Sequence, residues 1–138
     1  MQRMDQESIK GLQLFRAVKR GQISEVRRLL DEMAPPNEDV QQGWTPLFAA
    51  ASRGDTRVLR LLIEHGADVN LGLESGFTAL FGATLMGHLE AAQLLLDSRA
   101  SPLVGADRHR LSTYAPEGAC GKRIRELLRR AEAAAGMK

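Results

Sequence analysis

Residues 43–70 read GWTPLFAAASRGDTRVLRLLIEHGADVN, and this stretch decides the fold because its pattern recurs at a fixed spacing. Its opening nine residues reappear 33 positions later, where residues 76–84 read GFTALFGAT. The same offset aligns apolar positions before residue 43 and after residue 108, so four units fit one register without insertion. A recurrence at this period predicts a stack of small structural repeats rather than one compact core.

Each unit predicts two short helices joined by a tight turn. Thr45 is suited to cap the first helix, and Pro46 suits its first turn. Gly54 supplies the left-handed residue that ends this helix, and an apolar stripe at helical spacing then predicts a second helix. Residues 67–76 form an extended excursion to the next unit. Because one unit cannot bury its apolar face alone, the units must stack.

The 33-residue period, the motif G-x-T-P-L, the mid-unit glycine and the ending LIEHGADVN together resemble the ankyrin repeat. The resemblance covers nearly the whole chain, most strongly residues 43–97. It implies an all-α solenoid of four helix-turn-helix repeats joined by short β-hairpin loops. It also implies one domain over residues 1–138, with repeats at about 10–42, 43–75, 76–108 and 109–138, and a non-catalytic module that binds a protein as an adaptor or inhibitor.

The chain departs from the family pattern in several places. The family's histidine after T-P-L is replaced by an aromatic residue in each unit, which predicts apolar filling at that position. Arg99 stands where Gly66 stands one unit earlier, so we expect a strained or altered turn there. The first unit has an irregular loop around Pro35 and Pro36. The aromatic replacements are Phe15, Phe48, Phe81 and Tyr114.

Both ends of the chain are atypical. Residues 111–113 read LST in place of T-P-L, and Pro116 and Gly118 fall inside the expected first helix. We therefore expect that helix to be short or broken, followed by a second helix at about 122–134. Residues 1–10 extend the first helix backwards or fray.

Composition narrows the class of protein. Of the 138 residues, 43% are hydrophobic and 26% charged, which is typical of a globular chain and not of a disordered one. No apolar run approaches the roughly 18 residues of a membrane span. The single cysteine, Cys120, favours a reducing compartment. We therefore expect a monomer without a membrane segment, located in the cytoplasm and possibly the nucleus.

Residues that could carry catalysis, a cofactor or a metal do not form a working pattern. Gly121-Lys122 lacks the glycine and the hydroxyl residue of a phosphate-binding loop. His65, His88 and His109 have no metal-ligand spacing, and Cys120 has no neighbouring base and is expected in a turn. The sequence thus predicts no enzyme, no cofactor and no metal site.

The resemblance places partner binding at the hairpin tips and at the exposed face of the first helices. Trp44 is the only tryptophan, and Leu85 and Met86 replace the polar pair found one unit earlier. Tryptophan and arginine are enriched in interface hot spots, and methionine suits adaptable surfaces. Two alternatives stay open: Trp44 and Phe77 cover the hairpins by contacting each other, or Leu85 and Met86 tuck under the last unit. The predicted partner-binding residues are Trp44, Phe77, Leu85, Met86, Arg53, Arg20, Arg108, Arg110, Gln41 and Glu74.

The basic C-terminal helix is the rival site. Its cations either form the solvated face of a terminal helix or bind nucleic acid or an acidic protein. Nucleic acid is disfavoured because no aromatic residues interleave with the cations, the net charge is only +2, and residues 43–107 are net acidic. The cations are Lys122, Arg123, Arg125, Arg129 and Arg130.

Overall fold

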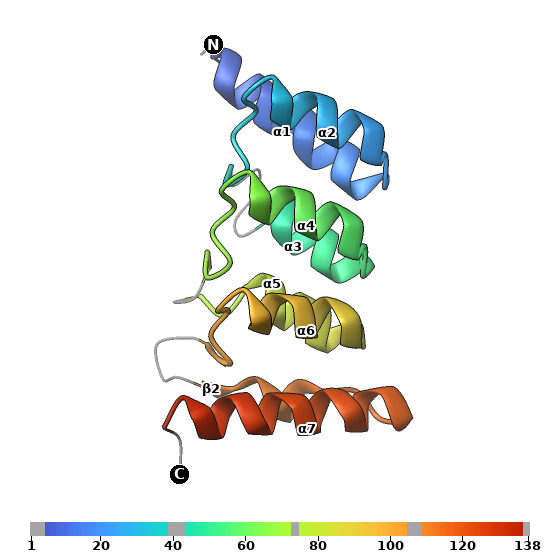
Figure 1. The fold of residues 1–138 in the computed structure, drawn as a ribbon, viewed down its shortest axis with the longest axis vertical. Coiled ribbons are helices and arrows are strands. Elements are labelled where there is room, and N and C mark those ends of the chain that lie inside the picture. Colours follow the sequence, from blue (N-terminus) through green and yellow to red (C-terminus); the bar gives the residue numbers. More distant parts are fainter. Residues whose placement is uncertain (1–4, 39–43, 73–74, 105–108, 137–138) are drawn as a thin grey trace.

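The computed structural model describes residues 5–38, 44–72, 75–104 and 109–136, and their helices stack in layers (Figure 1). Each layer pairs two antiparallel helices, and the last pairs a short 3₁₀ helix with the longest helix. This arrangement confirms the predicted all-α solenoid. The layers are α1 (Gln6–Lys19) with α2 (Ile23–Asp31), α3 (Pro46–Arg53) with α4 (Thr56–Glu64), α5 (Ala79–Leu85) with α6 (Leu89–Asp97), and η1 (Leu111–Tyr114) with α7 (Ala119–Ala134).

Strand structure in the described residues is limited to one small hairpin before the last layer. Strand β1 (Leu103–Val104) pairs antiparallel with β2 (His109–Arg110), with Leu103 opposite Arg110. The hairpin leads directly into η1, and so it sets where the last layer begins.

The predicted capping residues lie at the ends of α3 and α5, the first helices of the second and third layers. The Thr45 hydroxyl accepts from the Phe48 N–H at 3.1 Å, and Thr78 does the same for Phe81 at 3.2 Å. Gly54 ends α3 with a φ of 72°. At the N-terminal end, α1 begins at Gln6, so the described part of the first ten residues extends this helix backwards.

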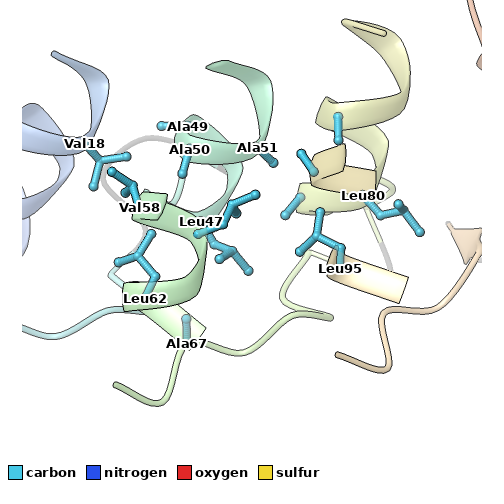
Figure 2. Close-up of a cluster of buried hydrophobic side chains, with 14 of the residues drawn as sticks. Val18, Leu47, Ala49, Ala50, Ala51, Val58, Leu62, Ala67, Leu80 and Leu95 are labelled. Atoms are coloured by element: carbon cyan, nitrogen blue, oxygen red, sulfur yellow. The ribbon is translucent and has the colours of Figure 1, made fainter. Parts of the chain in front are cut away.

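The core is a continuous apolar cluster that runs along the stack, and Figure 2 shows a part of it in close-up. Helix α3 packs between α1 and α5, and its residues Ala49, Ala50 and Ala51 are buried. Small side chains let these first helices approach closely, while larger ones such as Leu62 and Leu95 come from the second helices. The low aromatic content therefore reflects thin layers rather than a weak core.

The predicted irregular turns are present. Arg99 adopts the left-handed conformation, with a φ of 72°, in place of glycine. Met33 does the same with a φ of 67°, and residues 32–38 form turns rather than helix or strand. A side chain with a Cβ is strained in this region. Both turns are closed by a backbone hydrogen bond, from the Ala34 N–H to the Leu29 carbonyl oxygen and from the Ala100 N–H to the Leu95 carbonyl oxygen, each at 2.9 Å.

The last layer is shortened, as predicted, but two details differ. Its first helix is only the four-residue η1. The following helix, α7, begins at Ala119 rather than near residue 122, because Gly118, with a φ of 102°, makes the turn before it. Cys120 therefore lies in the first residues of helix α7 and not in the connecting turn where it was expected. It is exposed, and its Sγ donates to the Gly87 carbonyl oxygen at 2.9 Å.

Candidate partner-binding groove

A groove of about 420 Å³ opens between the first helices of the second and third layers. Its lining is mostly apolar and comes from α3, α5 and the residues flanking these helices. We call this surface the groove. It is lined by Trp44, Phe48, Ser52, Phe77, Phe81, Gly82, Leu85 and Met86.

The rim of the groove consists of four large apolar side chains that the sequence had singled out. Trp44 and Phe77 are 45% and 51% exposed, and Leu85 and Met86 are 50% and 58% exposed. Large apolar groups at this exposure, gathered in one place, mark a surface suited to a partner. The exposure of Leu85 and Met86 also shows that the alternative in which they tuck under the last unit is wrong.

The two aromatic rim residues pack on the aromatic row of the first helices. Trp44 meets Phe15 and Phe48 edge-on, with ring centroids 6.4 and 5.3 Å apart. Phe77 meets Phe81 edge-on at 6.0 Å. The other alternative required Trp44 and Phe77 to contact each other, but the ring contacts among the described residues pair each of them with phenylalanines. Rings held in this way lose little side-chain entropy when a partner binds.

Phe48, Phe81 and Gly82 line the groove but were not predicted to do so. Phe48 and Phe81 were expected to fill the interior, but both are only half-buried and contribute to the groove. Gly82 replaces the alanine found one unit earlier, and a Cβ there would lie 2.6 Å from the Ser52 Oγ. The missing side chain keeps the groove open. The change from alanine to glycine was therefore the signal in the sequence from which a groove at this position could have been predicted.

Two of the predicted cations, Arg53 and Arg20, lie at the C-terminal ends of α3 and α1, on the N-terminal side of the groove. Arg53 is exposed and donates from Nη1 to the Lys19 carbonyl oxygen at 2.9 Å. Arg20 is exposed at the end of α1. Arg110 is exposed in β2 and does not line the groove. The remaining predicted positions, Gln41, Glu74 and Arg108, lie outside the described residues.

The rival basic helix faces acidic groups of its own chain. Arg123 and Arg130 line a second cavity of about 750 Å³ between α4, α6 and α7. Glu90 and Asp97 line the same cavity. Opposite charges in one cleft reduce the positive potential that a nucleic acid would require. Lys122 and Arg129 are exposed, whereas Arg125 is half-buried and donates to the Ala115 carbonyl oxygen at 3.2 Å.

The titratable groups near the helices have structural partners. A ring nitrogen of His88 lies 3.0 Å from the Ser52 carbonyl oxygen, and one of His65 lies 2.8 Å from the Leu61 carbonyl oxygen. The Ser8 N–H lowers the pKa of Asp5, and the hydrogen bond from Arg28 lowers that of Glu25. Neither carboxylate lines the groove.

The described part of the chain holds no group of three or more His, Cys, Asp or Glu side chains placed to share a metal ion. None of its helices has the length and apolar character that crossing a membrane requires.

Comparison with family models matches residues 14–105 to ankyrin repeats, in three copies. The matched segment runs from the second half of α1 through α6, and it includes every residue that lines the groove. Comparison with curated proteins finds no match.

Proposed function

Because the chain belongs to the ankyrin repeat family, we propose that it is a non-catalytic adaptor or inhibitor that captures one protein partner in the groove. Ankyrin repeats are generally protein–protein interaction modules. The observation that carries the proposal is the preformed groove, whose four rim residues are each about half exposed. In this proposal one domain spans residues 1–138 and acts as a monomer in a reducing compartment.

Two features of the groove support the proposal: its rim side chains expose apolar area, and its two rim aromatic rings are held in place by contacts with other rings. Apolar surface removed from water by a partner contributes about 25 cal/mol per Å² before the costs of association. Trp44 and Met86 belong to residue types that often dominate such interfaces. Arg20 and Arg53 would form the charged edge of the interface, with Gln41, Glu74, Arg108 and Arg110 as contacts from the loop tips.

Affinity capture from a lysate of the source organism tests the proposal. We expect the double variant Trp44→Ala/Met86→Ala to lose the captured partner while its helical circular dichroism is retained. Leu85→Ala/Met86→Ala provides a second test that leaves the contacts of Trp44 in place. Removing exposed side chains from a hot spot reduces affinity by at least about tenfold.

The matched control is Lys122→Ala/Arg129→Ala, which removes exposed cations from α7. We expect this control to capture the partner as the wild type does. If the control loses the partner and both groove variants keep it, binding occurs on the basic helix and the groove proposal is wrong.

A further inference from the structure

We propose that the partner presents an acidic segment with apolar side chains, and that it binds with a defined polarity. Its apolar side chains occupy the groove, and its carboxylates lie over the C-terminal ends of α1, in the first layer, and of α3, in the second. This inference rests on the proposed function and specifies the chemistry of the partner.

The cations of the first layer occupy the same repeat positions as the groove residues of the third layer. Lys19 and Arg20 precede Leu85 and Met86 by two repeat lengths, and Arg16 precedes Gly82 by the same distance. Helix α1 packs on α3, and α3 packs on α5. Equivalent positions in successive layers face the same side of a solenoid, so the cations and the groove share one surface.

These cations have no partner of opposite charge within the residues that the structure describes. The ion pairs found there join Arg28 to Glu25 and Glu32, Arg57 to Asp55, and His65 to Asp31. None of them involves Arg16, Lys19, Arg20 or Arg53, the four residues that we call the cation edge.

The cation edge is also poorly balanced by acids on the same row of helices. Helices α1, α3 and α5 contain one acidic residue, Glu7, in the first turn of α1. Arg53 is held in place by its hydrogen bond to the Lys19 carbonyl oxygen, so part of the charge is preorganised. A fixed positive edge beside an apolar groove favours a ligand whose carboxylates lie on one side of its apolar residues.

The lining of the groove favours a peptide over single-stranded nucleic acid. A stacking platform for bases presents aromatic faces along a track that is basic throughout. Here the aliphatic side chains of Leu85 and Met86 form half of the rim, and the cations lie on one side only. A nucleic acid would therefore leave part of its backbone beside an apolar surface.

Selection from a display library of random 12-residue peptides tests the inference. Panning uses the full chain, and peptides are kept only if Leu85→Ala/Met86→Ala abolishes their binding. We expect these peptides to carry two or more apolar residues with an excess of Asp and Glu on one side. Trp44 is the only tryptophan and lines the groove, so its fluorescence reports the affinity of each synthetic peptide directly.

Charge reversal at the cation edge gives the decisive comparison. Lys19→Glu/Arg20→Glu should weaken the selected peptides by about tenfold or more, and the wild-type affinity should fall with added salt. The matched control, Arg27→Glu/Arg129→Glu, makes the same charge change on exposed second-helix positions and should alter affinity by less than about threefold. Circular dichroism checks that both variants keep their helices.

The possible failures are distinguishable. If no peptide depends on Leu85 and Met86, the proposed function and this inference both fail. If groove-dependent peptides are selected without an acidic excess, or if both charge-reversed variants weaken them equally, the inference alone is wrong. Tighter binding of a 12-nucleotide single-stranded DNA than of any selected peptide would also overturn it.

Discussion

At the scale of single residues, two helical glycines leave no room for a side chain, for different reasons. A Cβ added at Gly121 would lie 1.7 Å from the Pro116 carbonyl oxygen, which is backbone and cannot move aside. A Cβ at Gly11 would lie 2.7 Å from the Glu38 Cγ and 2.8 Å from the Glu38 Cβ, which rotation of that side chain does not displace. The backbone at Glu38 must therefore shift slightly to admit alanine at position 11, whereas α7 must move much further to admit alanine at position 121.

Alanine at these two positions should change stability by different amounts. Gly121→Ala should lower the free energy of unfolding by about 2 kcal/mol or more, because the helix must shift away from Pro116. Gly11→Ala should lower it by less, because alanine favours the helix by up to about 1 kcal/mol and this gain offsets part of the cost of displacing Glu38. Urea denaturation followed by circular dichroism measures both, and a loss of similar size in the two variants would contradict this account.

At the scale of elements, one buried carboxylate joins α7 to η1. Glu132 is only 3% exposed and accepts from both the N–H and the hydroxyl of Ser112, each at 3.0 Å. The last layer has a shortened first helix, so it has less apolar surface with which to hold its two elements together. The hydrogen bonds of Glu132 contribute to holding this layer closed.

Substitution of Glu132 tests that role. Glu132→Ala should lower the free energy of unfolding by about 2–4 kcal/mol, because two buried donors of Ser112 lose their acceptor. Glu132→Gln keeps one acceptor oxygen and should cost less, about 1 kcal/mol. Urea denaturation of the full chain gives both values. A Glu132→Ala variant as stable as the wild type would show that η1 and α7 are held by apolar packing alone.

At the scale of the whole molecule, asparagines at one repeat position tie successive layers together. Asn37 donates to the Gly66 carbonyl oxygen at 3.3 Å and accepts from the Asp68 N–H at 2.7 Å. Asn70, which lies 33 residues later, repeats this with the Arg99 carbonyl oxygen at 3.2 Å and the Ser101 N–H at 2.8 Å. These bonds fix the spacing of the loops on the edge opposite the helix–helix turns.

Removing the side-chain amide of Asn70 should destabilise the protein and open the adjacent loop. Asn70→Ala should lower the free energy of unfolding by about 1–3 kcal/mol and speed hydrogen exchange at the Ser101 amide. The control Asn70→Asp retains the acceptor and should keep that amide protected. Exchange of the Ser101 amide at the wild-type rate in Asn70→Ala would mean that the asparagine does not couple the layers.

The sequence alone determined the repeat period, the helix pairs and most of their ends, because these depend on residues only a few positions apart. Thr45 caps the helix that begins at the next residue, and Gly54 ends it. The expected break in the last unit likewise followed from Pro116 and Gly118, which lie two positions apart in the chain. The four residues of the groove rim could also be selected as candidates. Trp44 and Phe77 are large aromatic residues at predicted hairpin tips, and Leu85 and Met86 replace the polar pair found one unit earlier.

Only the tertiary structure decided which side chains from different helices contact each other. Stacking sets the distance between layers, so it determines that Trp44 packs on Phe15 from the preceding unit and that Phe48 and Phe81 line the groove. It also placed Glu132 against Ser112, twenty positions away. Such contacts join residues of different helices, and their geometry depends on how the layers pack, which no spacing within one unit specifies.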